Sequence, residues 1–289
     1  MRDPLKCSMI GLVAALAFSS VVALAQGAQT TNQTRNGGVP QNPQRKDDDS
    51  PGGPAPVRDL SGTYRGADEA LLNNRIPPMT PAGQARLKRN IPDPFSASSN
   101  DPWKTCDPFG MPRTVNNQIG MVGFAQMPDR VIILEDFSKA WREIWTDGRQ
   151  LPKNVGHKGG PSATYFGYSV GHWEGDHTLV VDTIGMDDST WVDRRGYPHS
   201  VDAHVIERYE RPDHNHLNVT ETVDDPAYYT SSFVIAKTTY KWIPGQDDPT
   251  AAAIPFTPEH LCVASEAIDY MKLLAEPADE DAAIGNKKR

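Results

Sequence analysis

The second half of this chain alternates short apolar runs with turn signals, and almost no helical pattern lies between them. Dipeptides such as Asp147-Gly148 mark the turns. These connections are short, whereas a crossover between parallel strands needs a dozen or more residues, so the pattern predicts antiparallel pairing. The expected strands are residues 60–64, 120–127, 130–137, 140–145, 165–173, 178–184, 204–211, 217–223 and 230–242.

We therefore expect an all-β fold, in which an antiparallel meander of about eight strands closes into a lipocalin-like barrel. A β-sandwich is the alternative architecture. Outside the strands we expect one short helix at residues 81–90, with Thr80 as its N-cap and Pro81 at its first position, and long N-terminal loops. A closed barrel of this size has interior room for side chains or for one small ligand.

The first residues indicate export. Met9 to Leu24 form an apolar run, and Ala23-Leu24-Ala25 is typical of a cleavage site, so residues 1–25 are expected to be a signal peptide cleaved after Ala25. We expect a disordered tether at 26–57, a single β-barrel domain at 58–275 and a flexible tail at 276–289. The mature protein is thus expected to be periplasmic or secreted.

Two cysteines remain in the mature chain, Cys106 and Cys262, and an even pair in an oxidising compartment favours a disulfide between them over two buried thiols. The formal net charge of −8 argues against nucleic acid as a partner, because nucleic-acid binding needs a basic face. No later run is long and apolar enough for membrane insertion. The expected partner is a small molecule, and the oligomeric state stays open.

Residues 171–176, GHWEGD, place two carboxylates, a histidine and a tryptophan between two strand-like runs. Gly175 and Asp176 are natural turn residues, so this segment is expected to be a hairpin turn with Trp173 packed on the sheet. Asp182, on the return strand, alternates in phase with Val180 and Ile184 and is therefore expected to point inward. A buried carboxylate of this kind is either a functional group or part of a structural ion network.

The loop at residues 185–204 carries four aspartates, two histidines, Ser200 and Trp191. A histidine beside a carboxylate can act as a general acid–base near neutral pH. We therefore take His199 as the candidate acid–base, with Asp182 or Asp193 as its partner carboxylate. The alternative is a solvated loop in which the acids cap backbone amides.

A second group of polar side chains comes from the strands. Arg142 and Glu143 lie between Trp141 and Trp145, and Glu207 and Arg208 lie between Ile206 and Tyr209, so one residue of each pair is expected to point inward. An inward Arg142 or Arg208 against Asp182 or Glu207 would form a buried ionic network. Such a network either holds the barrel shut or binds a ligand. The candidate substrate-binding residues are Arg142, Arg149, Tyr168, Trp191 and Glu207.

The sequence does not support three specific functional motifs: a nucleophile elbow, a zinc site and a nucleotide-binding loop. Residues 167–171 match G-x-S-x-G only in their letters, because no helix follows Ser169 as a nucleophile elbow requires. The spacing of His199 and His204 is a poor match to a zinc site, and no glycine loop opens a helix as nucleotide binding demands. We expect neither a metal nor a cofactor.

Several motifs occur in a fixed order along the chain: 77–81 (PPMTP), 106–113 (CDPFGMPR), 145–149 (WTDGR), 167–176 (GYSVGHWEGD), 191–193 (WVD), 198–200 (PHS) and 224–228 (DDPAY). As a set they resemble a large family of uncharacterised exported bacterial proteins. The resemblance covers roughly residues 60–269 and includes both mature cysteines. The family pattern has arginine at the position of His172 and threonine at that of His177, whereas Asp182, Trp191, Asp193 and His199 match it.

Two functions follow from these residues. The first is an exported, metal-independent enzyme with hydrolase or lyase acid–base chemistry on a small polar or aromatic compound. The second is a periplasmic barrel that binds a small ligand without catalysis. A carboxylate bonded to His199 at the wall of a pocket favours the enzyme, and a dry aromatic cavity favours the binding protein.

Overall fold

A computed structural model of the chain describes residues 50–65, 76–92, 96, 98–116, 121–136 and 140–243. The expected signal peptide, Cys262 and the tail at 276–289 lie outside these residues, so the signal peptide and the disulfide stay predictions. The described chain begins at Ser50, inside the expected tether. There the carbonyls of Pro51 and Gly53 accept backbone hydrogen bonds from Asn215 and His214.

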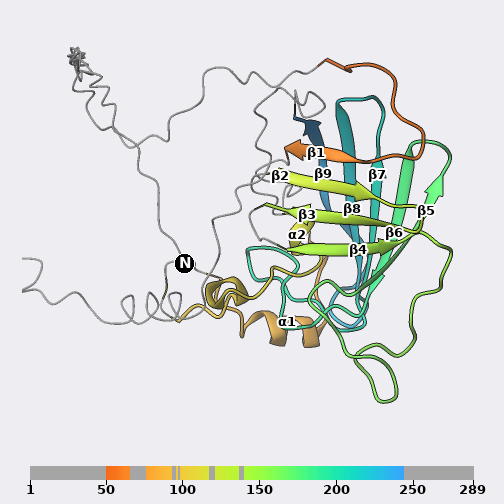
Figure 1. Cartoon of the computed structure of the whole chain (residues 1–289). Helices are drawn as coiled ribbons and strands as arrows, with labels where there is room; N and C mark the ends of the chain where they lie inside the picture. The colour runs from red at the N-terminus through yellow and green to blue at the C-terminus, as the bar shows by residue number, and fades with distance from the viewer. Residues whose placement is uncertain are drawn as a thin grey trace, which may run out of the picture. The chain divides into compact units, whose positions relative to one another are not determined.

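Nine strands form one closed barrel in the order of the chain, which confirms the all-β barrel (Figure 1). The strand number is nine rather than about eight. The strands are β1 Gly62–Arg65, β2 Met121–Gln126, β3 Arg130–Glu135, β4 Trp141–Trp145, β5 Tyr168–Glu174, β6 Thr178–Ile184, β7 His204–Glu210, β8 His216–Asp224 and β9 Phe233–Trp242. The barrel closes where Tyr64 of β1 pairs with Trp242 of β9.

The sheet is mixed, because β4 and β5 run parallel while every other neighbouring pair is antiparallel. The prediction of a wholly antiparallel meander is therefore wrong at this step. The connection between the two strands, residues 146–167, has the length that a parallel crossover needs, but it contains no helix. Its lack of helical pattern led to the wrong expectation.

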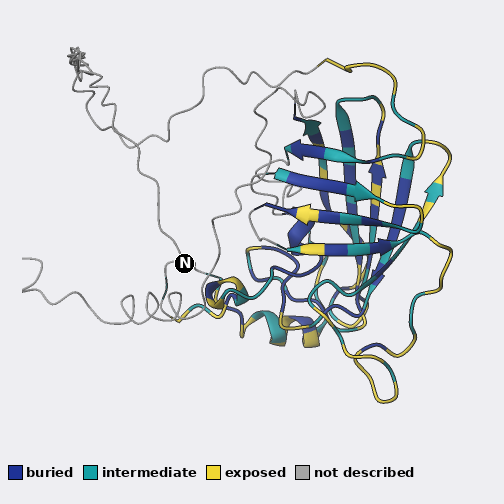
Figure 2. Cartoon of the chain, viewed as in Figure 1, coloured by how far each residue is buried: buried dark blue, intermediate teal, exposed yellow. Residues whose placement is uncertain are grey.

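Alternation along the strands places the core inside the barrel (Figure 2). In β8 every second residue is buried, and the inward set ends at Val223. This inward set also includes Glu221, which is fully buried. The interior thus mixes apolar packing with carboxylates, and any buried charge there needs a partner.

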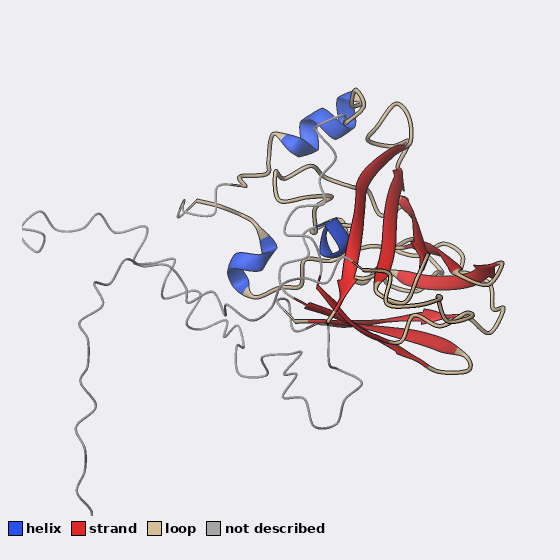
Figure 3. Ribbon diagram, turned by 90° about the horizontal axis from the view of Figure 1, so that it is seen from above, coloured by secondary structure: helices blue, strands red, loops and turns tan. Residues whose placement is uncertain are grey.

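In the described part of the chain, three short helices accompany the strands: α1 Pro81–Leu87, η1 Pro102–Thr105 and α2 Arg113–Asn116. Figure 3 shows them on one side of the strands. Thr80 caps α1 by accepting a hydrogen bond from the Gly83 amide, as predicted, although α1 ends three residues earlier than expected. The η1 and α2 helices were not expected, because prolines dominate the segment that holds them.

The α2 helix lies against the barrel interior, and all four of its residues are buried. Thr114 donates a hydrogen bond to Glu135 of β3, Asn116 donates one to Glu221 of β8, and the Val115 carbonyl accepts one from Tyr240 of β9. The helix is therefore fixed to three strands through polar groups that face inward.

The hairpin between β5 and β6 confirms the interpretation of GHWEGD. Glu174 pairs with Thr178 across the turn, and Gly175 has a positive φ of 66°. Trp173 packs against the hydrophobic core. His172 lies on the exposed side, 3.7 Å from a Glu174 carboxylate oxygen.

Candidate functional site

A cavity lies where β4 and β5 separate. Only two residue pairs join these strands, Ile144 with Ser169 and Trp145 with Val170. The chain leaves β4 through a turn at Gly148, whose φ is 83°, and returns only at Gly167. Because the strands diverge beyond this short contact, a cleft of about 500 Å³ opens between them, and we call it the β4–β5 cleft.

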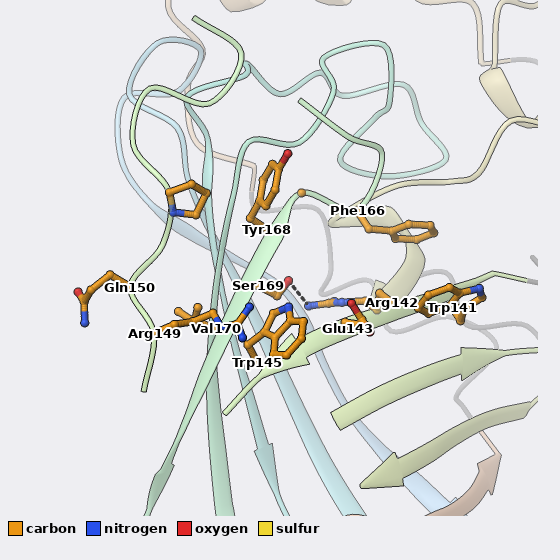
Figure 4. Close-up of a pocket in the computed structure, with 12 residues that line it drawn as sticks. Trp141, Arg142, Glu143, Trp145, Arg149, Gln150, Phe166, Tyr168, Ser169 and Val170 are labelled. Atoms are coloured by element: carbon orange, nitrogen blue, oxygen red, sulfur yellow. Dashed lines mark hydrogen bonds between the residues drawn. The ribbon is translucent and has the colours of Figure 1, made fainter. Parts of the chain in front are cut away.

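Aromatic rings and polar groups from both strands line the β4–β5 cleft (Figure 4). Its lining consists of Trp141, Arg142, Glu143, Trp145, Arg149, Gln150, Pro152, Phe166, Gly167, Tyr168, Ser169 and Val170. Trp141 is the most exposed of these rings, with 58% of its surface accessible, so its face is available to a ligand. The cleft combines apolar area with a few convergent polar groups, which is typical of small-molecule sites.

Arg142 and Ser169 point inward from their strands and reach the cleft from the barrel interior, as the bond between them in Figure 4 shows. The Arg142 guanidinium donates to the Glu207 carboxylate at 3.0 and 2.7 Å and to Ser169 Oγ at 3.1 Å. Burial opposes the charge of Arg142, but Glu207 outweighs it, and the pKa of Arg142 lies above its ordinary value. Arg142 therefore stays charged and its charge is balanced within the barrel.

One donor of Arg142 remains unused by the protein. Its Nε is buried and has no hydrogen-bond partner among the described residues. Buried polar groups in native proteins nearly always have a partner, so this N–H is a candidate contact for a ligand acceptor.

The rim of the cleft carries paired charges. Arg149 donates to the Asp147 carboxylate, and its guanidinium carbon lies 3.4 Å from the centre of the Trp145 ring. Arg130 stacks on the same ring at 3.8 Å and pairs with Glu143 at 3.0 Å. These contacts hold Trp145 in place and leave the rim without a strong net charge.

Three of the residues predicted to bind a substrate lie together at one cleft. Arg142, Arg149 and Tyr168 all line the β4–β5 cleft, and Glu207 lies directly behind it as the partner of Arg142. Strand alternation places Arg142 and Glu207 on the inner face and Tyr168 on the outer face, whereas Arg149 lies in the loop after β4. Of the inward ion pairs that the sequence left open, the structure forms the one between Arg142 and Glu207.

His199 and its loop lie elsewhere. His199 is fully buried, with Nε2 2.7 Å from Thr190 Oγ1 and Nδ1 3.1 Å from the Ser200 carbonyl. Burial lowers the pKa of His199 below its ordinary value. Nδ1 donates to the Ser200 carbonyl, and Nε2 shares a hydrogen bond with the Thr190 hydroxyl, which also contacts the Asp187 carbonyl at 2.9 Å. No described carboxylate is bonded to the His199 ring.

Asp193 and Trp191 have structural contacts in the same loop. Asp193 is fully buried, and its carboxylate accepts hydrogen bonds from the amide and side chain of Arg195. Trp191 is 1% exposed and lies under the guanidinium of Arg113, 5.5 Å from its carbon. Neither side chain lines the β4–β5 cleft.

The expectation of an inward Asp182 is wrong. The inner face of β6 carries Leu179, Val181 and Thr183, while Asp182 is partly exposed on the outer face. The phase argument failed because Val180 is also buried, although it lies on the outer face. Asp182 instead accepts a hydrogen bond from His204 Nε2 at 2.8 Å.

The barrel interior holds a further carboxylate that sequence reasoning did not identify. Glu221 is fully buried, its Oε2 accepts a 3.3 Å hydrogen bond from Asn116, and its Oε1 has no partner among the described residues. Burial, reinforced by the charge of Glu207, raises the pKa of Glu221 well above its ordinary value. Glu221 thus holds its proton to a higher pH than an ordinary glutamate does.

Sequence reasoning also missed Trp141, Trp145 and Phe166 as cleft residues. A signal was present, since Trp141 and Trp145 are four residues apart in one strand and must share its face. What the sequence did not reveal was the parallel pairing that opens a cleft beside them.

Among the described residues, no three or more histidine, cysteine, aspartate or glutamate side chains are grouped so that they could hold a metal ion. Within these residues, no helix has the length and apolar character to cross a membrane.

The chain was compared with known proteins at the levels of family, sequence and structure. No protein family matches it, no curated protein is significantly similar, and no solved structure shares its fold at a significant level. The resemblance to exported bacterial proteins therefore stays an expectation that rests on the sequence motifs, and function has to be inferred from the cleft itself.

Proposed function

We propose that this protein is an exported barrel that binds a small aromatic compound in the β4–β5 cleft. The observation that carries the proposal is the lining of the cleft, where the rings of Trp141, Phe166 and Tyr168 lie beside the buried donors Arg142 and Ser169. Aromatic rings offer large contact area with a preferred geometry, and a few fixed donors orient the ligand.

The charge balance of the site limits the ligand class. Because Glu207 neutralises Arg142 and Asp147 neutralises Arg149, the cleft offers donors without a free positive charge. A full anion would lose its hydration without gaining an unpaired cation. We therefore expect a neutral aromatic ligand whose ring stacks in the cleft and which carries one polar acceptor, such as a carbonyl, ester or phenolic oxygen.

Export is part of the proposal and rests on the sequence. The apolar run at residues 9–24 and the motif ending at Ala25 support cleavage and release to the periplasm or the medium. A barrel in that compartment would meet small aromatic compounds from outside the cell.

An enzyme with hydrolase or lyase chemistry is the second candidate. The acid–base role expected for His199 gains no support, because the nitrogens of this buried ring bond to Thr190 and the Ser200 carbonyl. The observation that favours an enzyme is instead the partly exposed His204–Asp182 pair on the outer face of the barrel.

Calorimetric titration of the purified full chain with 1-naphthol tests the binding proposal, because this ligand is neutral, aromatic and carries one oxygen. Trp141→Ala should raise the dissociation constant by about 5- to 10-fold, because an aromatic pair contributes roughly 1 kcal/mol to binding. The matched control is Trp103→Ala, which removes another partly exposed tryptophan outside the cleft and should leave affinity unchanged. Absence of saturable binding, or equal affinity in Trp141→Ala and the native chain, would overturn the proposal.

A further inference from the structure

A histidine and an aspartate form a close pair on the outer face of β6 and β7. His204 Nε2 lies 2.8 Å from Asp182 Oδ1, and about a third of each side chain is exposed. Because an ionised carboxylate only accepts hydrogen bonds, Nε2 carries the hydrogen and the neutral ring keeps its lone pair on Nδ1. Within the described residues, Nδ1 has no hydrogen-bond partner, so a proton acceptor faces solvent.

Strand register places this pair next to the β4–β5 cleft. Val170, which lines the cleft, is the direct cross-strand neighbour of Asp182. Tyr168, also in the lining, pairs with Ile184, and Ile184 pairs with His204. Adjacent strands lie roughly 5 Å apart, so His204 is about two strand spacings from the Tyr168 wall on the same outer face. An aromatic compound would have to extend roughly 10 Å over the outer face from Tyr168 to place its other end beside His204.

Other charged groups near His204 are few. Asp224 of β8 is its cross-strand partner, and Asp202 precedes it by two residues but is bonded to His157. Arg208, further along β7, is paired with Glu174. Asp182 is therefore the carboxylate bonded to the His204 ring among the described residues, and it fixes the orientation and tautomer of that ring.

We infer that His204 is a general base for hydrolysis of a neutral aromatic ester held in the β4–β5 cleft, with Asp182 as its positioning residue. The inference rests on the proposed binding function. His204 Nδ1 takes a proton from a water molecule as the water oxygen forms a bond to the acyl carbon. The ester C–O bond then breaks, and the leaving oxygen takes the proton from the imidazolium. Ester and water give one carboxylic acid and one phenol, and the ring returns to its neutral form.

The chain provides a matched control for this pair. His157 Nε2 lies 2.7 Å from Asp202 Oδ1, and His157 is half exposed, but it lines a different cavity from Tyr168 and Val170. Each of the two histidines thus has its own carboxylate partner and is exposed to solvent. They differ in their distance from the β4–β5 cleft. If any exposed histidine could catalyse the reaction, replacing either one would lower the rate to the same extent.

The test uses the full chain and 1-naphthyl acetate, and follows release of 1-naphthol. His204→Gln should lower kcat by about 100-fold or more, the usual contribution of a general base, with little change in KM. Asp182→Asn should lower kcat less than His204→Gln and also leave KM nearly unchanged, because the ring loses the carboxylate that orients it while the cleft stays intact. His157→Gln should retain kcat within about two-fold of the native value.

Calorimetric binding of 1-naphthol to each variant separates the two proposals. Binding retained in His204→Gln while hydrolysis is lost supports both of them. Binding without hydrolysis in the native chain, equal hydrolysis in His204→Gln, or an equal loss in His157→Gln, overturns the role of His204 and leaves the cleft proposal standing. Absence of binding to the native chain overturns the cleft proposal and this inference together.

Discussion

Replacement of Arg142 by methionine is expected to destabilise the barrel strongly. The change removes the guanidinium that donates to both oxygens of Glu207, at 3.0 and 2.7 Å, and to Ser169 at 3.1 Å. Glu207 would then be a fully buried carboxylate whose remaining side-chain donor among the described residues is the Tyr209 hydroxyl. Breaking one side of a buried ion pair typically costs about 3–5 kcal/mol, and we expect a loss of that size in the free energy of unfolding.

The double variant Arg142→Met/Glu207→Leu should be more stable than Arg142→Met alone. It removes both charges and leaves Ser169 bonded to Thr183 at 2.9 Å. Its main loss is the acceptor of the Tyr209 hydroxyl, which costs about 1–3 kcal/mol when a buried group becomes unsatisfied. The pair is therefore expected to be strongly coupled.

Urea unfolding followed by circular dichroism measures the four free energies of this cycle. Glu207→Leu alone should also lose about 3–5 kcal/mol, because it leaves the Arg142 charge buried. A double variant whose loss equals the sum of the two single losses would refute the account of a coupled ion pair behind the cleft.

Two further predictions concern pH and stability. Because the pKa of Glu221 is raised, the folded state keeps a proton on this residue that the unfolded state loses above about pH 4.3. Glu221→Gln should therefore be more stable than the native chain. Its advantage in the free energy of unfolding should grow by up to about 1.4 kcal/mol per pH unit toward neutral pH. The same substitution at exposed Glu210 is the control, and a margin for Glu221→Gln that does not depend on pH would contradict the raised pKa of Glu221. Because the pKa of His199 is lowered, the unfolded state takes up a proton below about pH 6.5 that the folded state does not. The stability of the native chain should therefore fall as the pH falls below that point. In urea titrations at pH 5 to 7, His199→Gln should remove part of this fall. An identical pH dependence in His199→Gln would show that the ring is charged in the folded state.

The existence of the strands could be predicted from the sequence, because alternation with period two depends on local pattern alone. The pattern also indicates that one residue of Arg142–Glu143 and one of Glu207–Arg208 faces inward, but it does not say which, and in the structure they are Arg142 and Glu207. The same reasoning failed for Asp182, because β6 carries buried residues on both of its faces and the phase of the pattern is then ambiguous.

The position of the cleft could not be predicted, because it depends on pairing between strands that are separated by residues 146–167. The parallel contact of Ile144 with Ser169 is a tertiary feature with no local signal. For the same reason, the pairing of His204 with Asp182, 22 residues apart, appeared only in the structure, whereas His199 attracted attention by its acidic neighbours in sequence.

The central claim is that a small aromatic ligand binds in the β4–β5 cleft, and a ¹⁵N-resolved NMR titration with 1-naphthol tests it most directly. The chain has six tryptophans, and only two of them, Trp141 and Trp145, line the cleft. Binding in the cleft predicts saturable shifts of those two indole N–H signals, with the other four unchanged. Shifts confined to Trp191 or Trp103, with Trp141 and Trp145 unmoved, would place the ligand elsewhere and contradict the account.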